Sequence, residues 1–185
     1  MKFTALLAAA AVLVPLAPVC AQQPTLEQRV QRIEDDLAIK QVILDYAVRL
    51  DARDFDGYVA LFAKDGTWQN GNTIKHGRDE IRQMLVGIYG NPQPGAAPNT
   101  DSYRIVSNVD VQIDGDHATA HSRQLTIMRG ENGSPIPRLS GIYDDEFVRE
   151  DGAWKILHRI DRTIMPTPAE WQKQMAELRA KQAQK

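Results

Sequence analysis

The pattern of apolar and polar residues changes period once along the chain, from a helical repeat to a strict alternation. Before residue 90, apolar residues recur every three or four positions, the spacing of one helix face. This predicts a long helix over 26–50, a short helix over 54–62 and a third helix over 77–89, with a capping box of Thr25 and Gln28 starting the first. The predicted inner stripe of the long helix is Leu26, Val30, Ile33, Leu37, Val42, Ile43, Tyr46, Ala47 and Leu50.

After a Pro- and Gly-rich loop over 90–99, apolar and polar residues alternate with the period of a strand. We expect four long strands, which short glycine turns join into an antiparallel meander. Strands near ten residues long favour a twisted and bent sheet. The predicted strands are 103–113, 117–128, 139–149 and 154–164, preceded by a short extended segment at 67–69.

Helices followed by a meander predict an α+β fold with the helices on one face of a strongly curved, mostly antiparallel sheet. We expect a cone-shaped α+β barrel closed by the N-terminal helices, and its hollow is the usual place for a small-molecule ligand. One domain is predicted over 22–165. A second capping box at Thr167 opens a C-terminal helical extension within 166–185.

The N-terminus has the pattern of a cleavable secretory signal over 1–21. It carries one basic residue, an apolar run of about a dozen residues, and small residues just before Gln22. This predicts a periplasmic or secreted protein. A lipid anchor on Cys20 is the alternative, but the bulky and rigid residues before it disfavour that processing.

Composition excludes several classes of function. The net charge is −2 and charges alternate in sign without forming blocks, so neither a nucleic-acid groove nor a basic face for anionic lipid is predicted. No second apolar run is long enough to span a membrane. Cys20 is the only cysteine, which removes thiol chemistry and disulfides from the mature chain. No metal-ligand spacing or phosphate-binding glycine loop appears, so we expect no metal and no cofactor.

Five segments, in their order and spacing, resemble the SnoaL-like proteins of the nuclear-transport-factor-2-like (NTF2-like) superfamily. They are 46–58, 61–68, 76–81, 106–109 and 141–156, and the resemblance runs over about 26–164. It implies the cone-shaped fold, a small hydrophobic ligand, and a homodimer that pairs through the outer sheet face. The superfamily includes dehydratases, isomerases, a dehydrochlorinase, polyketide cyclases and proteins that only bind, so the reaction stays open.

Among the enzymes, the chain is most similar in pattern to scytalone dehydratase, bile acid 7α-dehydratase and hexachlorocyclohexane dehydrochlorinase. In these an aspartate at the end of the first helix works with a histidine on the first long strand, and Asp51 matches that aspartate. The bile acid enzyme also places a tyrosine five residues earlier, which Tyr46 matches. The histidine would fall four residues before Asn108, where this chain has Arg104.

The resemblance therefore implies a catalytic set of Asp51, Tyr46 and Arg104. Asp51 would remove a proton next to a carbonyl, and Tyr46 and Arg104 would stabilise the oxyanion. Arg104 cannot be a base, and pairing with Asp51 would lower the pKa of that carboxyl. Two other interpretations stay open, in which Asp51 caps the short helix or forms a structural salt bridge with Arg104.

The predicted hollow would be lined by further polar and aromatic side chains. By alternation, His158 faces the interior and Arg159 faces outward, although a core histidine with satisfied hydrogen bonds is the alternative. The outer face would instead carry an apolar stripe of Val109, Val111 and Ile113. The predicted substrate-binding residues are Trp68, Asn108, Tyr143 and His158.

Together these observations favour a cofactor-independent lyase or isomerase that acts on a small hydrophobic cyclic substrate. A non-catalytic small-molecule-binding protein of the cell envelope is the first alternative. A structural dimer whose side chains fill the cone is the second.

Overall fold

The structure is a computed structural model, and it describes residues 23–93, 95 and 97–182. The predicted signal peptide, residues 1–21, lies outside the described residues. None of the helices in the described part of the chain is both long and apolar enough to cross a membrane.

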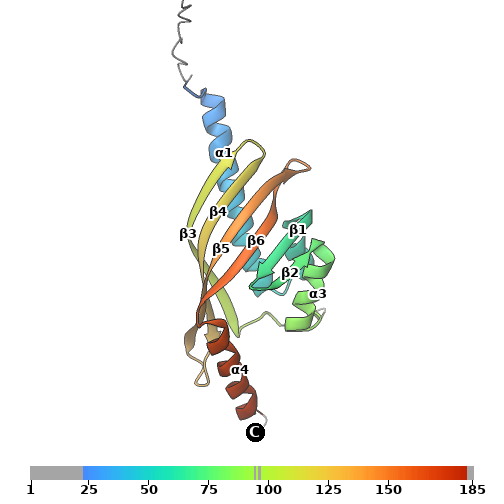
Figure 1. The fold of residues 1–185 in the computed structure, drawn as a ribbon, viewed down its shortest axis with the longest axis vertical. Coiled ribbons are helices and arrows are strands. Elements are labelled where there is room, and N and C mark those ends of the chain that lie inside the picture. The colour runs from blue at the N-terminus through green and yellow to red at the C-terminus, as the bar shows by residue number, and fades with distance from the viewer. Residues whose placement is uncertain (1–22, 94, 96, 183–185) are drawn as a thin grey trace, which may run out of the picture.

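A strongly curved, unclosed sheet with the strand order β2-β1-β6-β5-β4-β3 forms the body of the molecule (Figure 1). The pairing of β1 with β6 is parallel and every other pairing is antiparallel. The predicted meander is therefore confirmed, and an additional hairpin of β1 and β2 extends its edge beyond the segment expected at 67–69. The strands are β1 (Phe62–Asn70), β2 (Thr73–His76), β3 (Ser102–Asp114), β4 (His117–Arg129), β5 (Pro135–Glu150) and β6 (Ala153–Met165).

The helices begin where the capping signals predict. Thr25 and Gln28 form the capping box of the first helix, and the Asp54 side chain accepts a hydrogen bond from the amide of Gly57 at the start of the second. Thr167 bonds Glu170 at the start of the last helix, which Figure 1 shows extending away from the sheet. The helices are α1 (Leu26–Asp51), α2 (Phe55–Val59), α3 (Gly77–Tyr89) and α4 (Pro168–Gln182).

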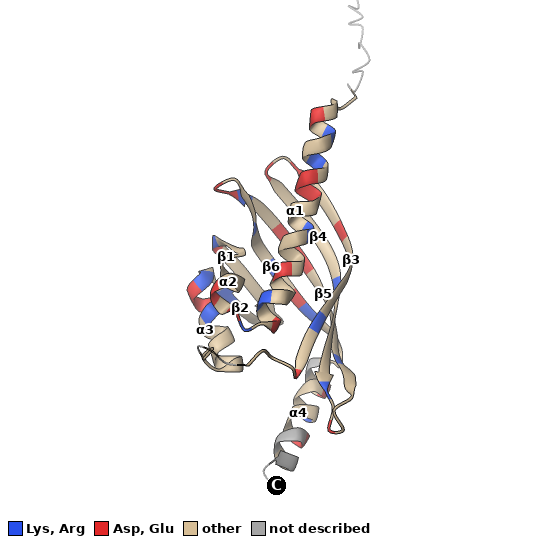
Figure 2. Cartoon of the chain, turned by 180° about the vertical axis from the view of Figure 1, so that it is seen from behind, with Lys and Arg blue, Asp and Glu red and all other residues tan. Residues whose placement is uncertain are grey.

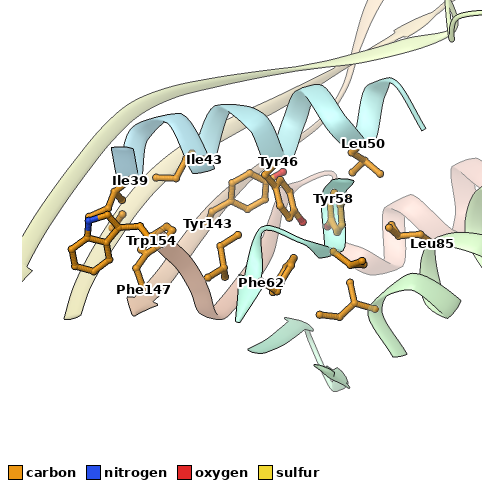
Figure 3. Close-up of a cluster of buried hydrophobic side chains, with 14 of the residues drawn as sticks. Ile39, Ile43, Tyr46, Leu50, Tyr58, Phe62, Leu85, Tyr143, Phe147 and Trp154 are labelled. Carbon is orange, nitrogen blue, oxygen red and sulfur yellow. The ribbon is translucent and has the colours of Figure 1, made fainter. Parts of the chain in front are cut away.

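Helix α1 lies on the inner face of the sheet and supplies one wall of the core. Ile43, Tyr46 and Leu50 belong to the same buried cluster as Tyr143 and Phe147 of β5 (Figure 3). The first half of the predicted stripe is wrong. Leu26, Val30, Ile33 and Leu37 are 45–72% exposed, because they lie on the opposite side of the helix from the buried residues.

A buried carboxylate fastens α1 to the sheet. Asp35 accepts hydrogen bonds from Arg149 Nη2 at 2.7 Å and from Trp154 Nε1 at 3.0 Å. Burial alone would raise the pKa of Asp35, but these bonds outweigh it and hold the pKa below its usual value. The sequence pattern gave no sign of this contact, because the two partners lie more than a hundred residues along the chain.

We expect Asp35→Ala to lower the free energy of unfolding by about 2–3 kcal/mol, because it leaves the buried Trp154 indole and the half-buried Arg149 without their shared charged acceptor. Since the folded pKa of Asp35 is depressed, its contribution is present above the unfolded pKa of about 4 and is lost as the pH falls through the folded value. Urea unfolding at pH 7 and at pH 3 measures both effects. Asp36→Ala, which removes only the pair with Lys40, should cost about 0.5 kcal/mol or less.

A β-bulge in β6 reverses the predicted orientation of its second half. Phe147 pairs with Ile156 and Glu146 pairs with His158, so Leu157 is the extra residue. One extra residue moves every later side chain to the other face. Arg159 is therefore buried inside the sheet, and His158 lies on the outer face, contrary to the prediction from alternation.

A second bulge, in β3, has the same consequence. The pairing skips from Ser107 to Asp110, and Asn108 has a left-handed backbone with φ 53°. Val109, Val111 and Ile113 consequently pack against the core inside the sheet, so the predicted apolar stripe on the outer face is wrong.

Candidate functional site

The Asp51–Arg104 pair lies between the last turn of α1 and the start of β3. Arg104 Nη1 donates to Asp51 Oδ1 at 2.6 Å, and the Arg104 backbone amide donates to Asp51 Oδ2 at 2.8 Å. The other terminal nitrogen of Arg104 donates to the Tyr89 hydroxyl at 2.9 Å. Both oxygens of Asp51 therefore already accept a hydrogen bond from Arg104.

Tyr46 contacts both Trp68 and Tyr143 on the inner side of the sheet. The Tyr46 ring lies 5.4 Å from the Tyr143 ring and 4.5 Å from the Tyr58 ring, measured between centroids (Figure 3). Trp68 Nε1 donates to the Tyr46 hydroxyl at 3.1 Å. Burial raises the pKa of Tyr46, Tyr58 and Tyr143, so all three phenols are neutral near pH 7.

Arg159, which alternation predicted to face outward, instead forms a buried ion pair with Asp145. Arg159 Nε and Nη2 each donate to one oxygen of Asp145 at 2.6 Å, and both side chains are fully buried. The guanidinium carbon lies 3.7 Å from the Tyr46 ring centroid and 4.4 Å from that of Tyr143. Arg159 is thereby held between two aromatic rings. Arg159, Tyr46 and Tyr143 therefore pack against one another on the inner face of the sheet.

Asp161 is the site residue that the sequence prediction missed. It faces inward from β6, and its cross-strand partner in β5 is Tyr143. Burial raises the pKa of Asp161 to about 6, although the positive charges of Arg159 and Arg104 oppose the rise. Its Oδ1 atom is buried without a hydrogen-bond partner. Such a carboxyl is suited to gain and lose a proton near neutral pH.

Three buried side-chain atoms in the described residues have no hydrogen-bond partner, and all belong to inward-facing residues of β4 and β6. They are Ser122 Oγ, Arg159 Nη1 and Asp161 Oδ1. Ser122 and Asp161 flank Tyr143 on its two sides, since both pair with it across neighbouring strands. Unpaired buried polar atoms are rare in folded proteins and mark places where a ligand group or water completes the network.

Two predicted binding residues lie elsewhere. Asn108 is exposed at the β3 bulge. His158 Nδ1 is 2.8 Å from the Thr67 hydroxyl on the outer face, where it borders a hollow of about 290 Å³. The residues that line this outer hollow include Asp110, His121, Asp144, Glu146, His158 and Ile160.

Figure 2 shows acidic and basic residues along both the helices and the strands, without a face of one sign. The charges nearest Asp161 are those of two Arg–Asp pairs of the inner face, Arg104–Asp51 and Arg159–Asp145. Asp161 is the one carboxyl beside them that lacks a salt bridge in the described residues. The inner face thus carries one negative charge when Asp161 is ionised.

Comparison with known proteins gives a family and a fold. The model of the SnoaL-like domain matches residues 31–160. An uncharacterized protein of Mycobacterium tuberculosis is 30% identical over 139 residues, which are 71% of this chain and 87% of that protein. A protein proposed to be a scytalone dehydratase, from Novosphingobium aromaticivorans, is 26% identical, with a TM-score of 0.60 over 74% of this chain and 89% of that one.

Two more distant structures share the fold alone. An NTF2-like protein with a cystatin-like fold from Novosphingobium aromaticivorans has a TM-score of 0.66 at 21% identity, over 78% of this chain and 91% of that one. A hexachlorocyclohexane dehydrochlorinase from Novosphingobium barchaimii has a TM-score of 0.60 at 18% identity, over 73% and 90%. With the family model matched along most of the described chain, this protein belongs to the SnoaL-like domain family.

Proposed function

We propose that this SnoaL-like protein is a cofactor-independent lyase or isomerase that moves a proton on a small, uncharged, hydrophobic cyclic molecule. The observation that carries the proposal is Asp161, a buried carboxyl with a free oxygen and a pKa raised to about 6. The 26% identity to a protein proposed to be a scytalone dehydratase supports the same class of reaction.

In the proposed reaction, Asp161 takes the base role that the resemblance gave to Asp51. The Asp161 carboxylate removes a proton from a carbon next to a carbonyl, and the C–H electron pair becomes an enolate. The unpaired Nη1 of Arg159 is suited to stabilise the enolate oxygen. The protonated Asp161 then returns its proton, either to another carbon in an isomerase or to a departing hydroxyl group in a dehydratase.

The charge balance favours a neutral substrate. Arg104 and Arg159 are each already paired with a carboxylate, and Asp161 adds a further negative charge above about pH 6. A substrate carboxylate would meet repulsion without a free cation to offset it. Trp68, which is half-buried and donates to the Tyr46 hydroxyl, supplies apolar contact for a ring-shaped molecule.

The test is a panel of cyclic ketones and hydroxyketones incubated with the protein in D₂O, with deuterium uptake and water loss followed by mass spectrometry. We expect turnover of neutral compounds and none of matched carboxylic acids. Because Asp161 acts in its ionised form, kcat/KM should rise with pH, reach half its maximum near pH 6 and level off about one pH unit higher. Turnover that is flat from pH 4 to pH 8 would contradict the base assignment.

A binding protein without catalysis is the second candidate. The Asp51–Arg104 pair favours it, because both oxygens of Asp51 already accept hydrogen bonds within the protein. Calorimetric binding of a neutral cyclic compound, with no exchange or water loss by any binder in the panel, would decide for this candidate.

We also propose that the protein acts outside the cytoplasm, on the basis of the signal pattern in residues 1–21. Cell fractionation and N-terminal sequencing should recover it outside the cytoplasm with Gln22 as the first residue. Recovery of the uncleaved chain from the cytoplasm would contradict this.

A further inference from the structure

Helix α1 carries a second apolar stripe on the side that faces away from the sheet. At 100° per residue its members lie within about 60° of one another around the helix axis. The buried residues Ile39, Ile43 and Tyr46 lie on the opposite side. The stripe consists of Leu26 (72% exposed), Val30 (45%), Ile33 (60%), Leu37 (60%), Leu44 (44%) and Val48 (60%).

The N-terminal turns of α1 extend beyond the sheet, as Figures 1 and 2 both show. A short helical segment is marginally stable in water unless an apolar face is covered. A continuous row of large exposed apolar side chains on a soluble domain marks an interaction surface. The stripe therefore requires a partner that is itself elongated and apolar.

The spacing of the stripe is that of a coiled-coil heptad. Val30, Leu37 and Leu44 occupy a positions, and Leu26 and Ile33 occupy d positions. Lys40 is the polar residue at the next d position, and its ammonium is held 2.7 Å from Asp36 of the same helix. A single polar residue in such a seam sets the register at some expense of stability. A second copy of the same helix fits this seam.

Charge at the flanking positions selects the orientation. In a parallel pair, Arg29 at a g position faces Glu34 of the second copy at an e position, and Asp36 faces neutral Gln41. In an antiparallel pair centred on the projecting turns, the repulsion between Glu27 and Glu34 would offset the attraction between Arg29 and Asp36. The parallel arrangement has two favourable pairs and no like-charge pair.

We propose that α1 forms a parallel, two-stranded coiled coil with α1 of a second copy through this stripe. The sheets then lie on the outer sides of the helix pair, because each sheet packs on the opposite face of its own α1. This interface leaves the outer sheet face free, so it differs from the pairing that the family resemblance implied. It does not depend on the proposed reaction.

Sedimentation equilibrium of the whole protein tests the proposal. We expect a dimer whose dissociation constant rises by roughly 100-fold or more in Leu37→Glu, since two carboxylates would be buried in the seam. Leu37 is exposed in one copy, so the variant should keep its helical circular dichroism. The control is Ile160→Glu, which makes the same kind of replacement at an exposed apolar residue of the outer sheet face. This variant should leave the dimer intact.

A wild-type monomer would overturn the proposal. So would dissociation by Ile160→Glu with no effect of Leu37→Glu, because pairing would then run through the sheet.

Cysteine cross-linking tests the orientation in a Cys20→Ser background. A parallel pair brings the two copies of residue 33 close enough for a disulfide, so Ile33→Cys should cross-link on mild oxidation. Arg32→Cys points away from the seam and should not. Equal cross-linking of both variants, or none of Ile33→Cys in a confirmed dimer, would overturn the parallel coiled coil.

Discussion

Asp161→Asn should lower kcat for proton transfer by about 10²- to 10⁴-fold, because asparagine cannot accept or return the proton. The side chain keeps its size and its place opposite Tyr143, so the loss should appear in kcat with little change in KM. Deuterium incorporation into the best neutral compound of the panel measures it. The control is Asp144→Asn, which changes the outward-facing neighbour of Asp145 and should leave the rate unchanged.

The same variant should make the protein more stable at neutral pH, which separates lost chemistry from lost structure. The pKa of Asp161 is raised in the folded state from an unfolded value near 4 to about 6, so ionisation disfavours folding. In the wild type, the contribution of Asp161 to stability is greatest below its unfolded pKa and falls as the pH rises through its folded pKa. Removing the charge should therefore raise the free energy of unfolding by up to about 3 kcal/mol at pH 7. A variant that loses both activity and stability would contradict the base assignment.

Local signals predicted the order and the ends of most elements. Thr25, Asp54 and Thr167 start helices because a side-chain oxygen can satisfy a free amide at each helix start, a contact within three residues. Glycine turns similarly placed the ends of β4 and β6 within one residue of the expected positions. These features depend only on neighbouring residues, so the sequence was sufficient for them.

Two β-bulges, in β3 and β6, decide which side chains face the inner side of the sheet, and the local sequence does not predict either of them. The bulge at Leu157 is recorded in the pairing of β6 with β5, and it places Arg159 and Asp161 inside. Without it, alternation assigns those positions to solvent and brings His158 in. A hint existed in the charge pattern, because Asp145 at an inward position of β5 needs a buried cation, and Arg159 is the one that it obtains.

The long helix shows a different limit of sequence analysis. Apolar residues from two opposite faces of α1 were merged into one predicted stripe, since each face alone satisfies helical spacing over part of the length. Only the position of the sheet separates them, with Tyr46 inside and Leu37 outside. The apolar residues of α1 that remain exposed form the stripe from which we infer the coiled coil.

Asp145→Ala should be the most destabilising single change in the described part of the protein, with a loss of about 3–5 kcal/mol in the free energy of unfolding. Both members of the Arg159–Asp145 pair are fully buried, so alanine leaves an arginine without a counter-ion between two tyrosine rings. Urea unfolding measures the loss. A loss below about 1 kcal/mol would show that the pair is accessible to water and contradict the described interior.

A double replacement, Asp145→Leu with Arg159→Met, should recover most of that stability, because no buried charge is then left without a counter-ion.

The milder variant Asp145→Asn tests whether the ion pair influences the proposed base, Asp161. The negative charge of Asp145 helps to raise the pKa of Asp161, so its removal should move the acidic limb of the kcat/KM profile to lower pH. An unshifted limb in a folded Asp145→Asn protein would mean that the titrating group is not Asp161. The ion pair would then be structural only.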